Sequence, residues 1–305
     1  MKKALFALLF AVLSCEAGVL DHLKKIEVKT GSAPIEGIGC LYLINLDQRP
    51  EKWERSLQQL ALYGISPQRF RAIYGWSRPP DALNGAGLVF QHGMWTGREA
   101  ALLCQPNGEL SLRHLDGSCY GKTCYSFWMS KGAIGCTLSH LSVLKDALDA
   151  GYPAAWVLED DIIVDQDPRK MSAYVEELSS LVGEDGWDLL YTDAPYLQGI
   201  DLDGDILRRL PWMWRPDMPS FDLRQIASSF DFGAFVKIGS RIRAHSLIVS
   251  RAGMKKILGF YETHGIFMPY DHELFFIPDI QAYAIKESVV TAFETTSDTR
   301  DRHFN

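Results

Sequence analysis

Apolar runs and segments with helical periodicity alternate along most of the chain. The run GCLYLINL, which ends at Leu46, is rich in β-formers and predicts a buried strand. Pro50 suits the first turn of a helix, and apolar residues follow it at helical spacing up to a stop at Gly64. The run RFRAIYG predicts a second strand that closes at Gly75. These three segments predict a β-α-β unit.

The same alternation returns after residue 131. An apolar run that directly follows a helix is typical of a parallel strand covered on both faces of its sheet. In chain order, the predicted elements are a helix over 132–151, a strand over 154–159, a helix from 167, a strand over 187–192, a strand over 245–250, a helix over 251–265 and short strands within 281–299. This order predicts an α/β fold.

Two stretches, 76–131 and 195–240, lack a long hydrophobic period. The first contains Pro79 and Pro80, several glycines and three cysteines, and it predicts an irregular insertion with short elements. The second is rich in Trp and Pro. The predicted organisation is a signal-like segment at 1–17, a linker at 18–37 and one α/β domain over 38–305 that carries the insertion.

Composition and charge reduce the possible classes of protein only a little. The chain has 305 residues, of which 47% are hydrophobic and 23% charged, so a large core can form. The net charge of -7 excludes a nucleic-acid-binding protein that works by bulk attraction. An anionic ligand must therefore be held by local basic groups or by a metal ion.

The N-terminus has the pattern of a secretory signal. Lys2 and Lys3 precede the apolar run ALFALLFAVLS, and small residues follow it. The run is too short to span a bilayer as a helix. The sequence VLSC also resembles a lipoprotein cleavage box, with Cys15 as the lipid acceptor. We expect an exported or membrane-associated protein; the alternative is an apolar helix packed on the domain of a cytoplasmic protein.

Five cysteines follow Cys15. Two of them, Cys40 and Cys136, lie in apolar or glycine-rich contexts and are predicted to be buried thiols. The other three lie in the insertion, where two could pair in an oxidising compartment. These three are Cys104, Cys119 and Cys124. Their spacing is unlike the usual zinc patterns, which disfavours a zinc site.

Three consecutive carboxylates, Glu159, Asp160 and Asp161, end the predicted strand over 154–159. In open α/β sheets, ligands bind beyond the carboxyl ends of the strands. Clustered carboxylates become favourable there when a divalent cation neutralises them, and oxygen ligands select Mg²⁺, Mn²⁺ or Ca²⁺. Such an ion would bridge the protein to a diphosphate. The alternative is a solvated acidic turn.

Five segments, in chain order, resemble motifs of glycosyltransferase family 25, which includes bacterial lipopolysaccharide sugar transferases and animal procollagen galactosyltransferases. The segments are LYLINLDQRPEKWERSLQQLALYGISPQRFRAIYG, GAIGCTLSHLSVLKDAL, WVLEDDIIV, HSLIVSRAGMKKIL and PYDHELF. Ala133 stands where the family usually has Glu. The resemblance covers roughly residues 40 to 300.

The resemblance implies a GT-A-like fold, with a mostly parallel sheet flanked by helices and long loop insertions. It implies inverting transfer of a galactose-like sugar from a nucleotide sugar, usually UDP-linked. The acceptor would be a hydroxyl of a glycan, a lipopolysaccharide or a protein. A divalent metal is also implied, with Mn²⁺ expected first and Mg²⁺ as the alternative.

The resemblance also assigns roles to the acidic residues. Asp161 is expected to be the first metal ligand, with Glu159 or Asp160 helping through ribose or water. His245 begins the late strand and is expected to bind the metal or the diphosphate; the alternative is a hydrogen-bonded structural histidine. Asp271 is the candidate general base that takes a proton from the acceptor hydroxyl. Its alternative role is a helix N-cap.

Further candidates surround the expected donor site. Asn45, Asp47 and Arg49 follow the first strand, where the nucleotide base and ribose should lie, although Arg49 could instead form a surface ion pair. Asp193 is a candidate for contact with the sugar or the acceptor. His140 lies on the apolar face of its helix and is either a packed core histidine or a donor-pocket residue.

Two other functions fit part of the pattern. A catalytically inactive relative could hold a glycan or a nucleotide without turnover. A metal-dependent phosphohydrolase could use the acidic cluster, although the sequence shows no second cluster of His and Asp ligands. Trp212 and Trp214 could stack on a sugar or simply anchor their loop. The export-like N-terminus departs from the bacterial family members, which are expected in the cytoplasm, where nucleotide sugars are made.

Overall fold

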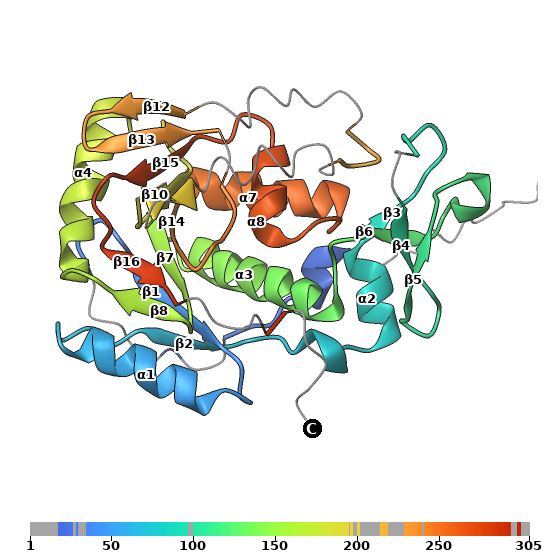
Figure 1. The fold of residues 1–305 in the computed structure, drawn as a ribbon, viewed down its shortest axis with the longest axis horizontal. Coiled ribbons are helices and arrows are strands. Elements are labelled where there is room, and N and C mark those ends of the chain that lie inside the picture. Colours follow the sequence, from blue (N-terminus) through green and yellow to red (C-terminus); the bar gives the residue numbers. More distant parts are fainter. Residues whose placement is uncertain are drawn as a thin grey trace, which may run out of the picture.

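An eight-stranded sheet lies at the centre of the computed structural model (Figure 1). Its strand order is β12-β13-β15-β9-β14-β7-β1-β2. In that order the strands are Ser229–Phe232, Phe235–Ile238, Ala282–Ile285, Leu189–Tyr191, Ser246–Ser250, Ala154–Glu159, Cys40–Asn45 and Gln68–Arg71. The structure describes residues 18–26, 29, 35–96, 100–194, 196–197, 200–201, 214–218, 229–239, 241–293 and 298–299.

The strands of this sheet run in both directions. β2, β1 and β7 are parallel neighbours, and so are β9 and β15, whereas β14 is antiparallel to both β7 and β9. The predicted α/β fold is confirmed, but the sheet is mixed rather than mostly parallel. The apolar pattern of β14 could not reveal its direction, because a strand buried on both faces has the same pattern in either direction.

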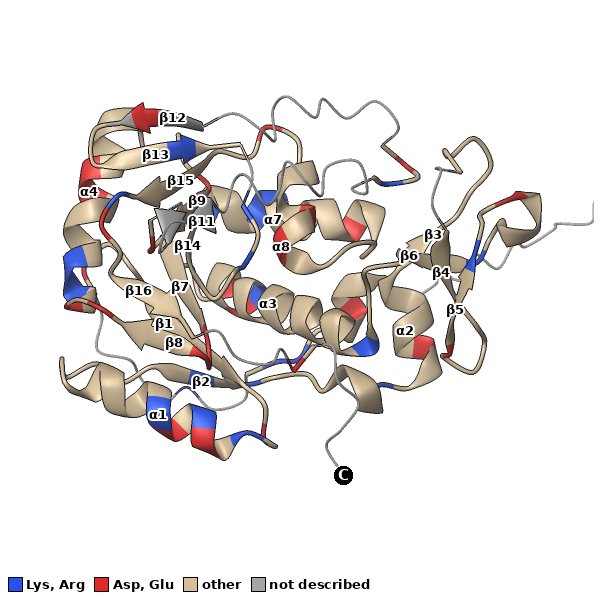
Figure 2. Cartoon of the chain, viewed as in Figure 1, with Lys and Arg blue, Asp and Glu red and all other residues tan. Residues whose placement is uncertain are grey.

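Helices cover both faces of the sheet. They are α1 (Pro50–Ala61) and α4 (Met171–Val182) on one face, and α3 (Lys131–Asp149) and α7 (Arg251–His264) on the other (Figure 1). Along β7, Trp156 packs in the core with α1 and α4, whereas Val157 packs in the core with α3 and α7. Figure 2 shows charged residues along α1 and α4, at the periphery.

The predicted helix boundaries have local causes that the structure confirms. The β-α-β unit consists of β1, α1 and β2, and Pro50 is the first residue of α1. α3 ends at Asp149, shortly before Gly151, which has a φ of +79° that favours glycine. Ser250 caps α7, since its side chain accepts a hydrogen bond from the backbone N–H of Gly253.

The insertion at 76–131 is more regular than predicted. It contains a four-stranded antiparallel sheet in the order β3-β6-β4-β5, beside the helix α2 (Figure 1). The elements are α2 (Pro80–Ala86), β3 (Leu88–Val89), β4 (Ala101–Cys104), β5 (Leu110–Arg113) and β6 (Thr123–Ser126). Strands this short carry too few alternating positions to give a periodic signal.

None of the five cysteines in the described part of the chain forms a disulfide. Cys104 and Cys124 lie on the strands β4 and β6, not in loops, and both are buried. Cys40 is buried in β1, as predicted. The insertion is therefore held by its strand pairing and apolar core.

Part of the predicted linker packs against the domain. The short helix η1 (Val19–His22) lies against α2 and α7, and Val19 is buried in the main core. Within the described ranges, no helix is both long and apolar enough to cross a membrane. The signal-like segment at 1–17, with Cys15, lies outside the described residues, and so does Trp212.

Candidate functional site

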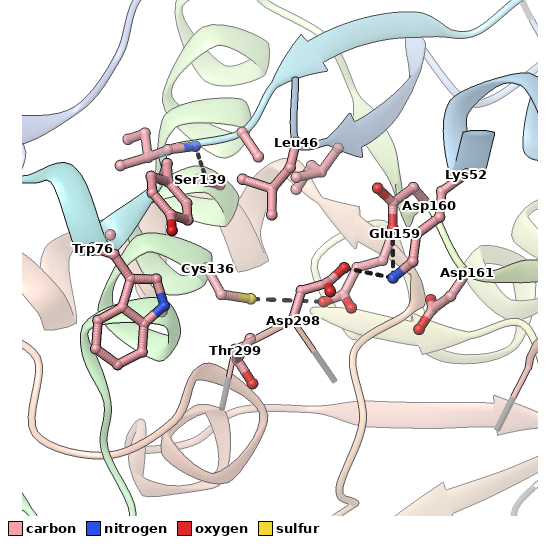
Figure 3. Close-up of a pocket in the computed structure, with 16 residues that line it drawn as sticks. Leu46, Lys52, Trp76, Cys136, Ser139, Glu159, Asp160, Asp161, Asp298 and Thr299 are labelled. Atoms are coloured by element: carbon pink, nitrogen blue, oxygen red, sulfur yellow. Dashed lines mark hydrogen bonds and ion pairs between the residues drawn. The ribbon is translucent and has the colours of Figure 1, made fainter. Parts of the chain in front are cut away.

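A pocket of about 680 Å³, partly open to solvent, lies at the carboxyl ends of β1, β2 and β7. Leu46 and residues 72–76 line it on the side of Trp76, and the acidic residues line its opposite end (Figure 3). Cys136 and Ser139 of α3 also face it. This is the position at which ligands bind in open α/β sheets.

The acidic turn after β7 is held by its backbone. The N–H of Glu159 donates to the carbonyl of His245 at 2.8 Å, and the hydroxyl of Ser56 donates to the carbonyl of Asp160 at 3.0 Å. The carbonyl of Asp161 accepts from the N–H of Phe293 at 2.8 Å. The three carboxyl groups are therefore fixed beside one another at the edge of the pocket.

Burial changes the acidity of this cluster. It raises the pKa of Asp160 to about 6, despite a hydrogen bond from Asn45. Burial, followed by the charge of Glu159, raises the pKa of Asp161 to about 6. Burial also acts to raise the pKa of Glu159, but the hydrogen bond and charge of His140 and the charge of His245 outweigh it and lower the pKa. The cluster thus carries unfavourable negative charge that a cation would relieve.

Several buried ligand atoms at this end have no hydrogen-bond partner. They include Oδ1 of Asp161, Nδ1 of His245 and Oδ1 of Asp193. The charge of His245 acts on the carboxyl groups of Glu159 and Asp161, so the ring lies close to both. Buried polar atoms without partners are costly, and a bound ion is a common reason for them. The Asp161 and His245 atoms are candidate ligands for an ion, but among the described residues they are not close enough together, with Glu159, to form a ready three-ligand site.

Asp193 faces His245 rather than the pocket. It is fully buried, and its Oδ2 lies 3.3 Å from Nε2 of His245. Burial acts to raise the pKa of Asp193, but the charge of the buried Arg241 outweighs it and keeps the pKa low. The Arg241 guanidinium also lies over the ring of Tyr191, 4.9 Å from its centroid. The predicted contact of Asp193 with substrate is therefore replaced by a contact with His245.

Asp271 is half-buried and held by two backbone N–H groups. Its Oδ2 accepts from Arg243 at 2.7 Å, and its Oδ1 accepts from His272 at 3.0 Å. It lies within the short helix α8 (Tyr270–Glu273), whose N-cap is Pro269, so the N-cap alternative is wrong. Arg243 has a φ of +79°, an uncommon conformation for a residue with a side chain. The backbone is thus bent to present its N–H to Asp271.

The residues predicted for the nucleotide have other partners. Asn45 is buried and donates from Nδ2 to Oδ2 of Asp160 at 2.7 Å. Asp47 pairs with Arg71 at 2.8 Å, away from the pocket. Arg49 donates from Nε to Oδ1 of Asp298 at 3.1 Å. None of the three predicted residues lines the pocket itself. Asn45 acts by positioning Asp160.

His140 supports Glu159 from the helix α3. Its Nε2 lies 2.9 Å from Oε1 of Glu159, and its ring stacks on Tyr270 with 4.4 Å between centroids. Cys136 Sγ lies 3.8 Å from the same carboxylate oxygen. In the described ranges, Cys136, His140 and Glu159 are the only three such side chains close enough together to share a metal ion. Through these contacts, His140 and Cys136 hold the Glu159 side chain of the acidic turn in place.

Sequence reasoning missed two residues of the site and left the role of Trp214 open. Lys52 and Asp298 both line the pocket, and their side chains meet at 2.6 Å. Lys52 is one of several charges on an amphipathic helix, and Asp298 lies in a polar C-terminal stretch, so no local signal marked them. Trp214 is buried against Trp95 and Phe267, which favours the anchor role over sugar stacking.

The sequence model described as "Glycosyltransferase family 25 (LPS biosynthesis protein)" matches residues 40–184. That range includes β1, the pocket wall, α3 and the acidic turn after β7. Over this part of its length the chain matches glycosyltransferase family 25. The acidic turn lies inside the matched range, whereas His245, Asp271 and Asp298 lie beyond it.

Three curated relatives show what this family contains. A "Glycosyltransferase 25 family member" of Aedes aegypti is 26% identical over 165 residues, which are 54% of this chain and 23% of the relative. "Procollagen galactosyltransferase 2" of Mus musculus is 26% identical over 163 residues, 53% of this chain and 22% of the relative. The human "Inactive glycosyltransferase 25 family member 3" is 24% identical over 156 residues, 51% of this chain and 22% of the relative. In each case the alignment spans less than a quarter of the relative.

Proposed function

We propose that this protein is a metal-dependent glycosyltransferase. It moves a galactose-like sugar from a UDP-linked donor to a hydroxyl of a glycan, a lipopolysaccharide or a protein. The observation that carries this proposal is the acidic turn, whose buried ligand atoms on Asp161 and His245 have no hydrogen-bond partner among the described residues and lie beside the pocket. The procollagen galactosyltransferase among the relatives supports the choice of sugar.

Asp161, Glu159 and His245 would hold the metal after their side chains move together, because their ligand atoms are not within sharing distance of one another in this structure. Carboxylate and imidazole groups suit Mn²⁺, with Mg²⁺ as the alternative. When bound, the ion would supply positive charge to the diphosphate that leaves the sugar. His140 and Asn45 keep the acidic turn in place, through their bonds to Glu159 and Asp160. Arg241 balances the charge of Asp193, so that Asp193 can hold His245 without adding to the repulsion.

The nucleoside would lie between Leu46 and residues 72–76, which form the less charged end of the pocket. The indole ring of Trp76 lines this end of the pocket (Figure 3), where it would stack on a base. The diphosphate would then point toward Asp161. The sugar would then extend past Glu159 toward Asp271, which does not itself line the pocket and lies on α8, a helix that contacts α3.

Asp271 would act as the general base in an inverting transfer. The acceptor hydroxyl gives its proton to a carboxylate oxygen of Asp271, and its oxygen forms a bond to the anomeric carbon of the sugar. The bond from that carbon to the phosphate oxygen breaks, and its electron pair leaves with the nucleoside diphosphate. The two N–H bonds from Arg243 and His272 hold the carboxylate in one orientation.

The deciding experiment is a donor screen. The full chain is incubated with a panel of nucleotide sugars and Mn²⁺, with glycan and peptide acceptors, and both the nucleoside diphosphate and the transferred sugar are quantified. We expect both products in equal amounts with a UDP-linked hexose. Release of inorganic phosphate instead would indicate a phosphohydrolase.

A second candidate function is binding without turnover. The human relative described as inactive shows that this family includes such proteins. In the same experiment, tight binding of a nucleotide sugar with no nucleoside diphosphate released, across all acceptors, would favour this alternative. The half-buried Asp271 beside the pocket wall of α3 favours turnover.

A further inference from the structure

Two cationic side chains at the start of α1 hold a carboxylate from the far end of the chain. Nζ of Lys52 lies 2.6 Å from Oδ2 of Asp298, and Arg49 donates from Nε to Oδ1 of the same group at 3.1 Å and also from its second terminal nitrogen. The Lys52 and Asp298 side chains are each only 13% exposed, and that of Arg49 is 28% exposed. This is a nearly enclosed ion-pair network in which one carboxylate is shared by two cations.

The network occupies the pocket itself. Lys52 and Asp298 both line it (Figure 3), and Lys52 is the only Lys or Arg among the described residues that do so. Nζ of Lys52 also lies 3.8 Å from Oδ1 of Asp160. Burial acts to lower the pKa of Lys52, but the hydrogen bond to Asp298 and the charge of Asp160 outweigh it and raise the pKa. Lys52 therefore stays charged, and its charge is already paired with the carboxylates of Asp298 and Asp160.

Residues at the start of α3 hold the segment that carries Asp298. The backbone carbonyl of Thr299 accepts a hydrogen bond from the hydroxyl of Ser130, the N-cap of α3. A Cβ atom on Gly132 would overlap the backbone of Thr299. The glycine thus allows a close backbone approach at the start of α3. Asp298 is placed by contacts on both sides of the pocket, from α1 and from α3.

We propose that Arg49 and Lys52 form a phosphate-binding subsite, and that Asp298 occupies this subsite as an internal competitor until an anionic ligand displaces it. The identity of the ligand as a nucleoside diphosphate rests on the proposed function. The subsite itself rests on the ion-pair geometry. Phosphate and carboxylate oxygens are interchangeable partners for a paired guanidinium and ammonium.

The charges in the pocket decide whether the removal of Asp298 strengthens or weakens anion binding. With Asp298 in place, the pocket holds four carboxylates, those of Glu159, Asp160, Asp161 and Asp298, and one lysine. A diphosphate that enters meets a carboxylate of like charge already bound to the cations that would hold it. Removal of the Asp298 charge releases both cations from this carboxylate, although Lys52 still lies near Asp160 and Arg49 near Glu51, and it removes the repulsion, so anion affinity should rise. For a partly exposed pair the gain is about two- to fivefold.

The test uses two probes on the full chain, measured by titration calorimetry. Inorganic pyrophosphate in EDTA reports on the cation pair alone, and UDP with Mn²⁺ reports on the donor site. The variant is Asp298→Asn. The matched control is Glu51→Gln, because Glu51 also pairs with Arg49, at 3.6 Å, but is 61% exposed and does not line the pocket. We expect tighter binding of both probes to Asp298→Asn and unchanged binding to Glu51→Gln.

A second variant tests the mechanism. Lys52→Met should weaken pyrophosphate binding. The rise in pyrophosphate affinity caused by Asp298→Asn should be smaller in the double variant than in the single variant. Unchanged or weaker pyrophosphate binding in Asp298→Asn, or none that can be measured, would overturn the subsite whatever the result of the transfer assays. Tighter pyrophosphate binding without any sugar transfer would support the subsite and contradict the proposed function.

Discussion

At the residue scale, Asp161 illustrates the cost of gathering buried carboxylates in the acidic turn. Burial and the charge of Glu159 raise its pKa to about 6 from an ordinary value near 4. A carboxyl group whose pKa is raised on folding favours the folded state below its unfolded pKa, and this contribution is lost as the pH rises through the folded pKa. Without metal, the ionised Asp161 should therefore destabilise the protein above about pH 6.

This gives a prediction for Asp161→Asn in the presence of a chelator. The melting temperature at pH 7.5 should rise by about 2–6 °C, and the gain should shrink toward pH 4. Differential scanning fluorimetry at several pH values measures it. Asp47→Asn is the control, because Arg71 lowers the pKa of Asp47 and its loss should give no gain. An equal gain in both variants at pH 7.5 would contradict the argument.

The second prediction at this scale concerns Asp271→Asn. A general base acts in the transition state, so turnover should fall by about 10²–10⁴-fold while the Kd for UDP stays nearly constant. The variant should be followed by kcat, UDP affinity and melting temperature together. Near-normal turnover with a lower melting temperature would show that Asp271 only holds the bent backbone at Arg243.

At the element scale, α3 and the pocket wall meet at a contact between glycines. A Cβ on Gly135 would overlap the backbone of Ile73 and Gly75. Gly135→Ala should therefore destabilise the protein by about 1–3 kcal/mol and weaken UDP binding. The control is Gly259→Ala at an exposed position of α7, where no described atom lies within 4 Å of the new methyl group, and it should stabilise by up to about 1 kcal/mol. Urea unfolding measures both, and equal effects would contradict the packing argument.

At the scale of the whole molecule, we expect the site to depend on a bound cation. Three strand ends, α1 and the segment 298–299 meet at one pocket, and the acidic charge they gather should be relieved by Mn²⁺. At 100 times its Kd, the ion should add about 2.7 kcal/mol to the free energy of unfolding. We expect a rise in melting temperature with Mn²⁺, its absence in Asp161→Asn, and loss of sugar transfer in EDTA. Full activity in excess EDTA would falsify metal dependence.

The sequence by itself determined the main elements and the location of the chemistry. Apolar runs identified β1, β7 and β14, helical periods identified α1, α3 and α7, and three adjacent acids marked the end of β7. These features are local, because burial leaves a periodic pattern within one segment and a strand end is defined by where that pattern stops.

Only the tertiary structure decided which polar side chains meet. The antiparallel direction of β14 and the small sheet of the insertion depend on pairing between distant segments. Lys52 and Asp298 are 246 positions apart, and Asp193 meets Arg241 from 48 positions away. A charged residue appears as the same polar position in the sequence whether its partner is water, a metal or another side chain. Its role is fixed only when the fold brings a partner within a few ångströms, since charge interactions depend on distance and burial.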